Sequence, residues 1–491
     1  MDSPMNGIDF SRALTTTSNG TLEYPKDSEV KTTMMKSARS IGGIMFLLRL
    51  DIRISTCLLR IRDKSLSASD AYLDGISIHL LNNPNIKVYD STMPVIMIIG
   101  DGMADLPLKE LGGKTPLQFA ETKNMASLTS KGRCGLLEHD AANAPDSEVA
   151  ITSILGYPEL SDALSRGPLE ALGSGIELDD KSLAFRCNFA LADNNLKILK
   201  DRVDVEEVDL REFFEDLSLY CSEKLGVEAI IRRNRRFKAV MALKGDNLSQ
   251  KVLAPPPSIE ETATRVKPLE ENVDAKSTSM MINSIIKESH NILMRLKGNS
   301  GLSCPANILI PWGVGRRLRP EHFKSRYGLK AACIAGSPLA KGIGIMLGMT
   351  VPKVEGATGY ADTDTDAKAE ATLEMCRGND YVLLHVGGPD EASHDGDPAS
   401  KVKIISKLDN MLGRILTELK LEDNLIILLA DHTTSTTLRK HTVHPTPIVI
   451  AGMHVIPDEV RKYDEQSVAN GSLRRIPMKK VMSTITEEII K

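Results

Sequence analysis

Six side chains of the types that bind hard divalent cations lie in short polar segments of this 491-residue chain. Asp390 and His394 are four residues apart in the segment GGPDEASHDGD, so a helical turn would direct both to the same side. Carboxylate oxygens and imidazole nitrogens together suit Mn²⁺, Mg²⁺ or Zn²⁺. Two such cations about 3.5–4 Å apart would promote phosphoryl transfer, because they stabilise both the attacking and the leaving oxygen. The candidate ligands are Asp101, Asp390, His394, Asp431, His432 and His441.

Each of these residues, taken singly, has an ordinary structural explanation, since an aspartate after a strand is commonly a helix N-cap. Their grouping favours a metal site instead. The chain has only 10 histidines, and the short segments around the aspartates contain His385, His394, His432 and His441.

A metal pair that transfers phosphate needs a nucleophile, and Ser147 is the candidate. The segment PDSEVA reads as a turn that leads into the helix-like run VAITSIL. At a helix N-terminus the partial positive charge favours a phosphate, and a bound metal would lower the pKa of the hydroxyl. On this segment alone, an ordinary serine N-cap with Glu148 in the first turn is the better interpretation.

Four apolar runs, at residues 94–99, 381–386, 424–430 and 447–450, predict strands buried on both faces. Helical patterns between them, such as 401–419, suit crossover helices of an α/β fold. Ligands of such sheets bind at the carboxyl ends of the strands, and Asp101, Asp431 and His432 fall at those ends.

The middle of the chain, residues 160–325, has a different sequence pattern. It contains FRCNF at 185–189, a strand-like segment at 237–244 and a Pro-rich break at 254–257. These features predict a smaller α+β domain inserted into the α/β core, which would consist of residues 93–159 and 326–491.

Residues 1–92 do not continue this pattern. Between 31 and 64 the chain has eight basic residues and only two acidic ones, Asp51 and Asp63. An organelle-targeting presequence has this composition. The alternative is upstream sequence without a function, with Met93 as the natural start, and the acidic residues within 1–30 favour it slightly.

Composition excludes several classes of protein. The net charge of -4 excludes a strongly basic nucleic-acid binder, and no apolar run reaches the ~18–20 residues of a membrane-spanning helix. The seven cysteines form no C-x-x-C pair, so they indicate a reducing compartment. We therefore expect a cytoplasmic protein, or an organellar one if residues 1–92 are a targeting segment.

The order of motifs resembles the archaeal-type cofactor-independent phosphoglycerate mutases of the alkaline phosphatase superfamily. The first half contains GDGMADLPLKELGGKTPL, a serine turn ending in LGY, RGPLEALGSGIEL and FRCNFA. The second half contains YGLKAACIAGSPLAKGIGIMLGM, VEGATGYADTD, HVGGPDEASHDGD, LADH and KHTVHP. The resemblance implies an alkaline-phosphatase-like α/β core with a mostly parallel sheet and an inserted α+β cap.

The resemblance also implies a site and a reaction. Asp390, His394 and His441 would bind one divalent cation, and Asp101, Ser147, Asp431 and His432 the other, with Mn²⁺ preferred over Mg²⁺, Zn²⁺ or Co²⁺. Ser147 would be the phosphorylated nucleophile and Lys341 would contact the transferring group. The enzyme would interconvert 3-phosphoglycerate and 2-phosphoglycerate, small phosphorylated substrates, without 2,3-bisphosphoglycerate; an oligomer is compatible with this. The candidate substrate-binding residues are Arg166, Arg186, Arg202, Arg316 and Arg317.

The chain departs from the family pattern near the nucleophile and in the cap. Asp146 and Glu148 flank Ser147 where Gly and Asp are usual, and Phe237-Lys238 replaces a His-Arg pair. Two alternatives therefore stay open. One is a metal-dependent phosphohydrolase, or a phosphotransferase acting on a small alcohol such as homoserine, with the same core. The other is an inactive homologue that keeps the metal site.

Overall fold

The computed structural model describes residues 15–16, 22–23, 94–139 and 144–490, and the chain divides into two units between Asp90 and Ser91. In the first unit, β1 (Thr15–Thr16) and β2 (Leu22–Glu23) pair antiparallel. The two interpretations of residues 1–92, a targeting presequence or upstream sequence without a function, concern residues that lie outside the described part of the chain, apart from these two strands. All the residues predicted to carry chemistry belong to the second unit.

A seven-stranded mixed sheet forms the centre of the second unit. Four neighbouring pairs of strands are parallel and two are antiparallel. The strands are, in spatial order, β12 (Ala331–Ile334), β13 (Tyr381–Val386), β3 (Val95–Gly100), β14 (Leu425–Leu429), β17 (Thr446–Gly452), β4 (Gly132–Glu138) and β18 (Arg474–Pro477). The mostly parallel sheet of the α/β class is confirmed. β17 is an exception to the parallel pairing that its apolar sequence predicted, because it runs antiparallel to both β14 and β4.

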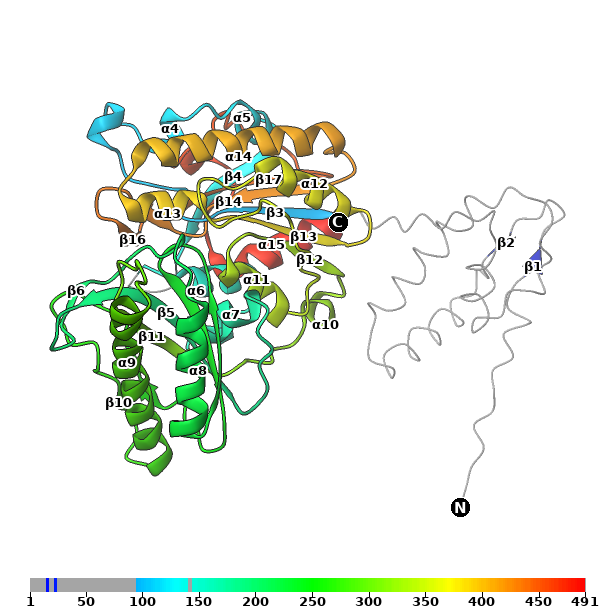
Figure 1. Ribbon diagram of the computed structural model, residues 1–491. Coiled ribbons are helices and arrows are strands. Elements are labelled where there is room, and N and C mark those ends of the chain that lie inside the picture. The colour runs from blue at the N-terminus through cyan, green and yellow to red at the C-terminus, as the bar shows by residue number, and fades with distance from the viewer. Residues whose placement is uncertain (1–14, 17–21, 24–93, 140–143, 491) are drawn as a thin grey trace, which may run out of the picture. The chain divides into compact units, whose positions relative to one another are not determined.

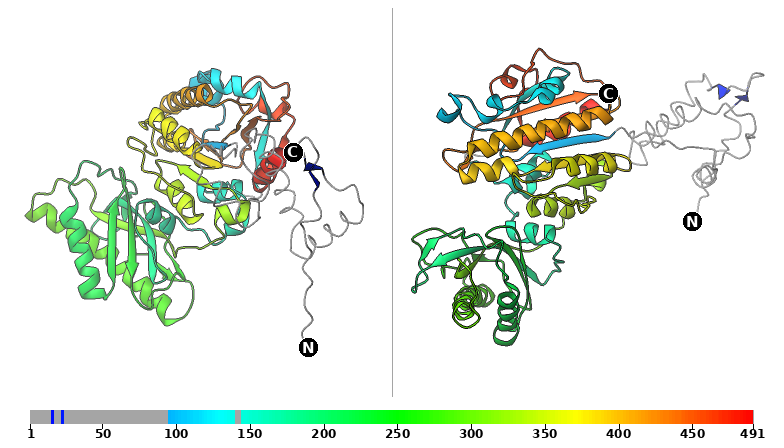
Figure 2. Two further views of the ribbon diagram at one scale, coloured as in Figure 1. Left: turned by 90° about the vertical axis from the view of Figure 1, so that its right-hand side faces the viewer. Right: turned by 45° about the horizontal axis from the view of Figure 1, so that its top comes forward.

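Helices cover both faces of this sheet, which explains why its strands are apolar throughout (Figures 1 and 2). Along β3, Val95, Met97 and Ile99 face one apolar layer, and Ile96 and Ile98 face the other. The first layer contains α6 (Ser147–Ile154), α10 (Phe323–Tyr327), α11 (Pro338–Met346) and α15 (Val481–Ile490). The second contains α4 (Pro116–Phe119), α5 (Lys123–Thr129), α12 (Thr365–Cys376) and α14 (Pro398–Glu418). Among the described helices, none is long and apolar enough to cross a membrane.

A second, antiparallel sheet is built from the middle of the chain. Its strands are β11 (Ile308–Gly315), β5 (Ser182–Ala192), β8 (Lys238–Lys244) and β7 (Glu228–Arg233), with β6 (Ile198–Lys200) beside β5. Two helices, α8 (Arg211–Leu225) and α9 (Val273–Asn299), pack against one face, where Phe185, Phe189 and Phe213 contribute to the core (Figure 1). A short ladder of β9 (Val252–Leu253) and β10 (Lys267–Pro268) adjoins α9.

Helix α7 (Arg166–Gly173) connects the two sheets, because it packs on the second sheet and also on α11. The two helices cross in backbone contact. A Cβ atom at Gly342 would lie 1.8 Å from the Leu169 carbonyl oxygen, and one at Gly173 would lie 1.8 Å from that of Pro338. No side chain fits at either position, so the glycines set how closely α7 approaches α11.

Candidate active site and metal centre

The predicted acidic ligands lie where strands of the central sheet end. Asp101 follows β3 directly, and its N–H donates to the Val386 carbonyl at the end of β13. Asp431 and His432 follow β14, the parallel neighbour of β3. Parallel pairing therefore places residues that are more than three hundred positions apart at one sheet edge.

The remaining predicted ligands come from a helix and a hairpin at the same edge. α13 (Gly388–Asp395) begins directly after β13, and Asp390 and His394 lie one turn apart on it, as the spacing predicted. His441 lies on β16 (Lys440–Thr442), which pairs with β15 (Thr433–Ser435). All seven predicted ligands are brought together by these elements and α6.

Ser147 is the first residue of α6, and Asp146 occupies the N-cap position. Ser147 is therefore not the N-cap that its local sequence favoured. Its side chain is buried, and its Oγ lies 3.1 Å from His432 Nε2. The hydroxyl is thus turned toward the metal ligands instead of toward the helix backbone.

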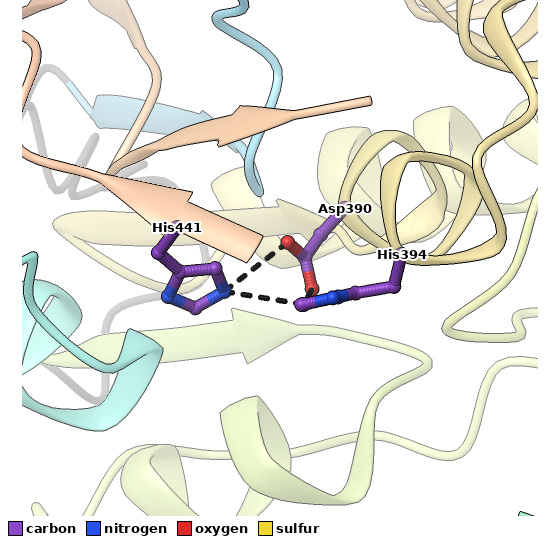
Figure 3. Close-up of side chains that lie close together, drawn as sticks. All are labelled: Asp390, His394 and His441. Carbon is purple, nitrogen blue, oxygen red and sulfur yellow. Dashed lines mark hydrogen bonds and ion pairs between the residues drawn. The ribbon is translucent and has the colours of Figure 1, made fainter. Parts of the chain in front are cut away.

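Figure 3 shows how Asp390, His394 and His441 converge. The Nε2 atoms of the two histidines lie 3.3 Å apart, and each is 3.4 Å from an oxygen of Asp390. Three ligand atoms from a helix and a strand therefore surround one point, which is the arrangement of a cation site.

The hydrogen bonds of these two histidines fix which nitrogen carries the proton. His394 Nδ1 lies 2.8 Å from the Arg439 carbonyl oxygen, and His441 Nδ1 lies 3.0 Å from that of Pro145. A carbonyl only accepts, so both Nδ1 atoms carry hydrogen and both Nε2 atoms of the neutral rings present lone pairs. Two lone pairs 3.3 Å apart repel each other unless a cation lies between them.

A second group surrounds Ser147. His432 Nε2 lies 3.2 Å from Asp101 Oδ1 and 3.5 Å from Asp431 Oδ2. Thr434 fixes the tautomer of His432, because its hydroxyl donates to Asp390 Oδ1 and therefore accepts from His432 Nδ1, at 2.7 and 3.0 Å. In the neutral ring, as a metal ligand requires, the Nε2 lone pair of His432 thus also faces the site. Through Thr434, the two ligand groups share one hydrogen-bond network.

The site carries an excess of buried negative charge. Burial raises the pKa of Asp431 to about 6, and the nearby charge of Asp101 acts in the same direction. Burial alone would lower the pKa of His432, but the carboxylates of Asp431, Asp101 and Asp390 raise it to about 9. Divalent cations would offset this negative charge, so the donor set fits metal ions.

Gly102 is required by the close packing of this edge. Its φ is +57°, and a Cβ atom there would lie 2.5 Å from Thr434 Oγ1 and 2.7 Å from Asp390 Oδ1. Its N–H donates to Asp431 Oδ1, which also accepts from the N–H of His432. The glycine lets the backbone approach and orient two of the acidic ligands.

A cavity of about 410 Å³ adjoins the site, between the sheet edge and the hairpin of β7 and β8. This volume is within the range of small-molecule sites. Its cations are Arg233, Arg235 and Lys238, and its other lining residues include Asp101, Ser337 and Tyr360.

None of the five arginines predicted to bind substrate lines this cavity. Arg186 pairs with Glu170 at 2.9 Å and lies over the Trp312 ring, and Arg202 lies over the Phe237 ring. The guanidinium of Arg316 is engaged by three backbone carbonyls, those of Asp180, Ser182 and Leu248. Arg317 has a buried Nε without a hydrogen-bond partner. Existing ion pairs and backbone contacts thus account for Arg186 and Arg316 without a ligand.

Arg166, the fifth of these arginines, lies near the carboxylates on both sides of Ser147. Its Nε donates to both carboxylate oxygens of Glu148, at 3.2 and 3.0 Å. The Glu148 carboxylate is therefore paired inside the protein, and Asp146 Oδ1 lies 3.8 Å from the same guanidinium. The ammonium group of Lys341, on α11, makes no hydrogen bond or ion pair among the described residues, and burial lowers its pKa.

Three features of the site were not predicted. His385 is a buried imidazole beside Asp101, and a lone titratable residue inside the apolar strand YVLLHV was the signal for it. Thr434 follows the LADH motif by two residues, and only the network reveals its role. The cavity cations come from the segment RRNRRFK, of which only Phe237 and Lys238 were considered from the sequence.

Comparison with known proteins identifies relatives over nearly the whole second unit. The metalloenzyme superfamily matches residues 93–488. The 2,3-bisphosphoglycerate-independent phosphoglycerate mutase 1 of Methanothermobacter thermautotrophicus is 38% identical over 401 residues, which are 80% of this chain and 97% of the relative. The corresponding mutase of Methanopyrus kandleri is 38% identical over 393 residues, 78% of this chain and 93% of its own.

Solved structures of two proteins are also similar to this chain. The cofactor-independent phosphoglycerate mutase of Thermoplasma acidophilum superimposes with a TM-score of 0.54 at 25% identity, over 81% of this chain and 99% of that one. A protein from Pyrococcus horikoshii gives a TM-score of 0.67 at 27% identity, over 81% and 97% of the two chains.

Proposed function

The chain belongs to the 2,3-bisphosphoglycerate-independent phosphoglycerate mutases of the metalloenzyme superfamily, and we propose that it interconverts 3-phosphoglycerate and 2-phosphoglycerate through a phosphoserine at Ser147. The single observation that carries the role of Ser147 is its position. The hydroxyl is buried, lies 3.1 Å from His432 Nε2 and shares that nitrogen with Asp101 and Asp431. No other described serine lies within hydrogen-bond distance of a predicted metal ligand's nitrogen.

The donor set fits two divalent cations. Asp390, His394 and His441 would hold one, and the other would be held by Asp101, Ser147, Asp431 and His432. Mn²⁺ suits the mixture of carboxylate and imidazole ligands, and Mg²⁺, Zn²⁺ and Co²⁺ are the alternatives. When bound, these cations would supply positive charge that activates the serine oxygen and stabilises the transferring phosphoryl group.

The residues of the chain perform the remaining steps. Ser147 Oγ attacks phosphorus, the bond from phosphorus to the substrate's 3-oxygen breaks, and the glycerate keeps that oxygen. The glycerate then turns, its 2-hydroxyl attacks the phosphoserine, and the serine oxygen leaves. Thr434 holds His432 with its Nε2 toward Ser147 throughout, and Lys341 is the proposed contact for the phosphoryl oxygens.

The cavity beside Asp101 is the proposed place of the glycerate. Arg235 and Lys238 are held by carboxylates, since Arg235 pairs with Glu206 and Asp362, and Lys238 pairs with Glu391. A substrate carboxylate would replace such partners, and guanidinium groups bind carboxylates in two-pronged fashion. Residues 160–325 would act as a cap that keeps water from the phosphoserine, because water there would convert transfer into hydrolysis.

Product analysis tests this function. With 3-phosphoglycerate and Mn²⁺, ³¹P NMR should show the resonance of 2-phosphoglycerate growing without release of inorganic phosphate. Phosphate release alone would identify a phosphohydrolase with the same core, and transfer only to an added alcohol would identify a phosphotransferase. No turnover with any of these would identify an inactive homologue.

A further inference from the structure

His385 is a buried imidazole that has no role in the proposed mechanism. It lies in β13, opposite Ile99 of β3, and only 1% of it is exposed. Neither of its ring nitrogens makes a hydrogen bond. A polar group that is buried without a partner is costly, so something absent from the chain itself should satisfy it.

The ring is directed at the metal ligands. Its Nε2 lies 3.4 Å from Asp101 Oδ2, and one ligand atom each of His385, Asp101 and Asp431 lie within 4.8 Å of one another. Two more buried atoms at this place lack hydrogen bonds, Asp101 Oδ1 and Asp431 Oδ2. One ligand atom from each of three buried residues thus lies around one point, and a single cation there would satisfy the two carboxylates and His385 Nε2.

We propose that His385 Nε2 is a further ligand of the cation held by Asp101 and Asp431. The inference rests on the proposed function only in assuming that this cation is present. Ligand atoms on a cation with bonds of about 2.1 Å lie about 3.0–3.4 Å apart at angles between 90° and the tetrahedral value. The separations of 3.4 Å from His385 Nε2 to Asp101 Oδ2 and 3.1 Å from His432 Nε2 to Ser147 Oγ are of that size, and the other Asp101 oxygen, Oδ1, lies 3.2 Å from His432 Nε2.

This assignment changes the expected metal preference. With His385, the cation would have two imidazole ligands, since His432 Nε2 is the other. Nitrogen ligands favour transition metals over Mg²⁺. His385 would therefore select Mn²⁺, Co²⁺ or Zn²⁺ at the cation that Ser147 contacts, and Mg²⁺ would bind there more weakly.

Proton NMR of the full-length wild-type protein loaded with Co²⁺ tests the inference. Each imidazole bound to Co²⁺ through one nitrogen gives a strongly shifted, exchangeable N–H resonance from the other. We expect four such resonances, from His385, His394, His432 and His441, with two equivalents of cobalt. Three resonances would overturn the inference, and so would a third equivalent of cobalt that requires His385, because the imidazole would then belong to a separate cation.

Substitution adds a second readout. The variant His385→Gln should lose one shifted resonance and bind one of its two cobalt ions at least about tenfold more weakly in chelator competition. The matched control is His290→Gln on α9, where Nδ1 contacts the Asn307 carbonyl far from the ligand groups, and it should keep all four resonances. The wild-type count stands even if His385→Gln does not fold.

The outcomes separate the inference from the proposed function. Three resonances with normal formation of 2-phosphoglycerate would overturn only the role of His385. Four resonances without formation of 2-phosphoglycerate would leave that role intact and overturn the proposed function.

Discussion

Thr434 Oγ1 links His432 to Asp390: it accepts from His432 Nδ1 at 3.0 Å and donates to Asp390 Oδ1 at 2.7 Å. One hydroxyl therefore joins a proposed ligand of each cation, and it sets both the tautomer of the imidazole and the orientation of the carboxylate. Groups that orient metal ligands in this way contribute strongly to metal affinity.

The variant Thr434→Val should weaken metal binding. Valine keeps the shape of threonine but leaves His432 Nδ1 and Asp390 Oδ1 without their partner, so the dissociation constant for Mn²⁺ should rise about 10–100-fold. Chelator competition measures this change. The control Thr434→Ser keeps the hydroxyl and should stay close to wild type. Unchanged affinity in Thr434→Val would mean that the network does not organise the ligands.

Arg235→Met should impair substrate binding. The guanidinium lines the cavity, and losing a charged hydrogen bond to the glycerate should raise KM for 3-phosphoglycerate at least about tenfold, with a smaller effect on kcat. Arg319→Met is the matched control, because Arg319 is exposed and pairs with Asp180 outside the cavity lining. Steady-state kinetics measure KM in both variants. Equal changes of KM in Arg235→Met and Arg319→Met would show that Arg235 does not bind the substrate.

Gly342→Ala should destabilise the protein. The added methyl group would meet the Leu169 carbonyl and force α7 from α11, at a cost of about 1–3 kcal/mol in the free energy of unfolding. Gly298→Ala on α9 is the control, since nothing lies within 4 Å of a Cβ there, and it should be neutral or stabilising by up to about 1 kcal/mol. Urea unfolding followed by circular dichroism compares the two variants, and equal stabilities would exclude a tight helix crossing.

Lys368 should make stability depend on pH. Burial, aided by the charge of Lys341, lowers the pKa of this fully buried lysine from 10.5 to about 7. Between these values the unfolded chain binds a proton that the folded protein has released. The free energy of unfolding of the metal-free protein should therefore rise with pH from about 7 toward 10.5, by at most about 1.4 kcal/mol per pH unit.

The variant Lys368→Met should lack this rise, since it has no group to titrate there. Thermal unfolding of both proteins between pH 7 and 9 measures the difference. If the two pH profiles run parallel, Lys368 stays protonated in the folded protein, held by the carbonyls of His385 and Thr358 that its Nζ contacts.

The sequence predicted the parts of the fold and site that depend on local patterns. Apolar runs identified β3, β13 and β14, and the spacing of Asp390 and His394 identified a helical turn. Residues at the ends of parallel strands share an edge, so their convergence could be expected.

The features that the sequence could not predict depend on contacts between distant segments. An apolar strand has the same sequence pattern in either direction, so the antiparallel pairing of β17 stayed hidden. The partners of arginines are also set by tertiary structure, which is why Arg316 seemed available and Arg235 was not among the candidates. His385 was counted among the clustered histidines but not as a ligand, because its place inside an apolar strand indicates a core residue.

Trapping of the phosphoenzyme tests the central claim most directly. The full-length protein with Mn²⁺ is mixed with 3-phosphoglycerate, quenched in acid, digested and analysed by mass spectrometry, with Ser153→Ala as the control for a serine on the same helix. The account predicts one phosphoryl group on Ser147 in the wild type and in Ser153→Ala, and none in Ser147→Ala, which should also form no 2-phosphoglycerate. Turnover by Ser147→Ala at the wild-type rate, or a phosphoryl group on another residue, would contradict it.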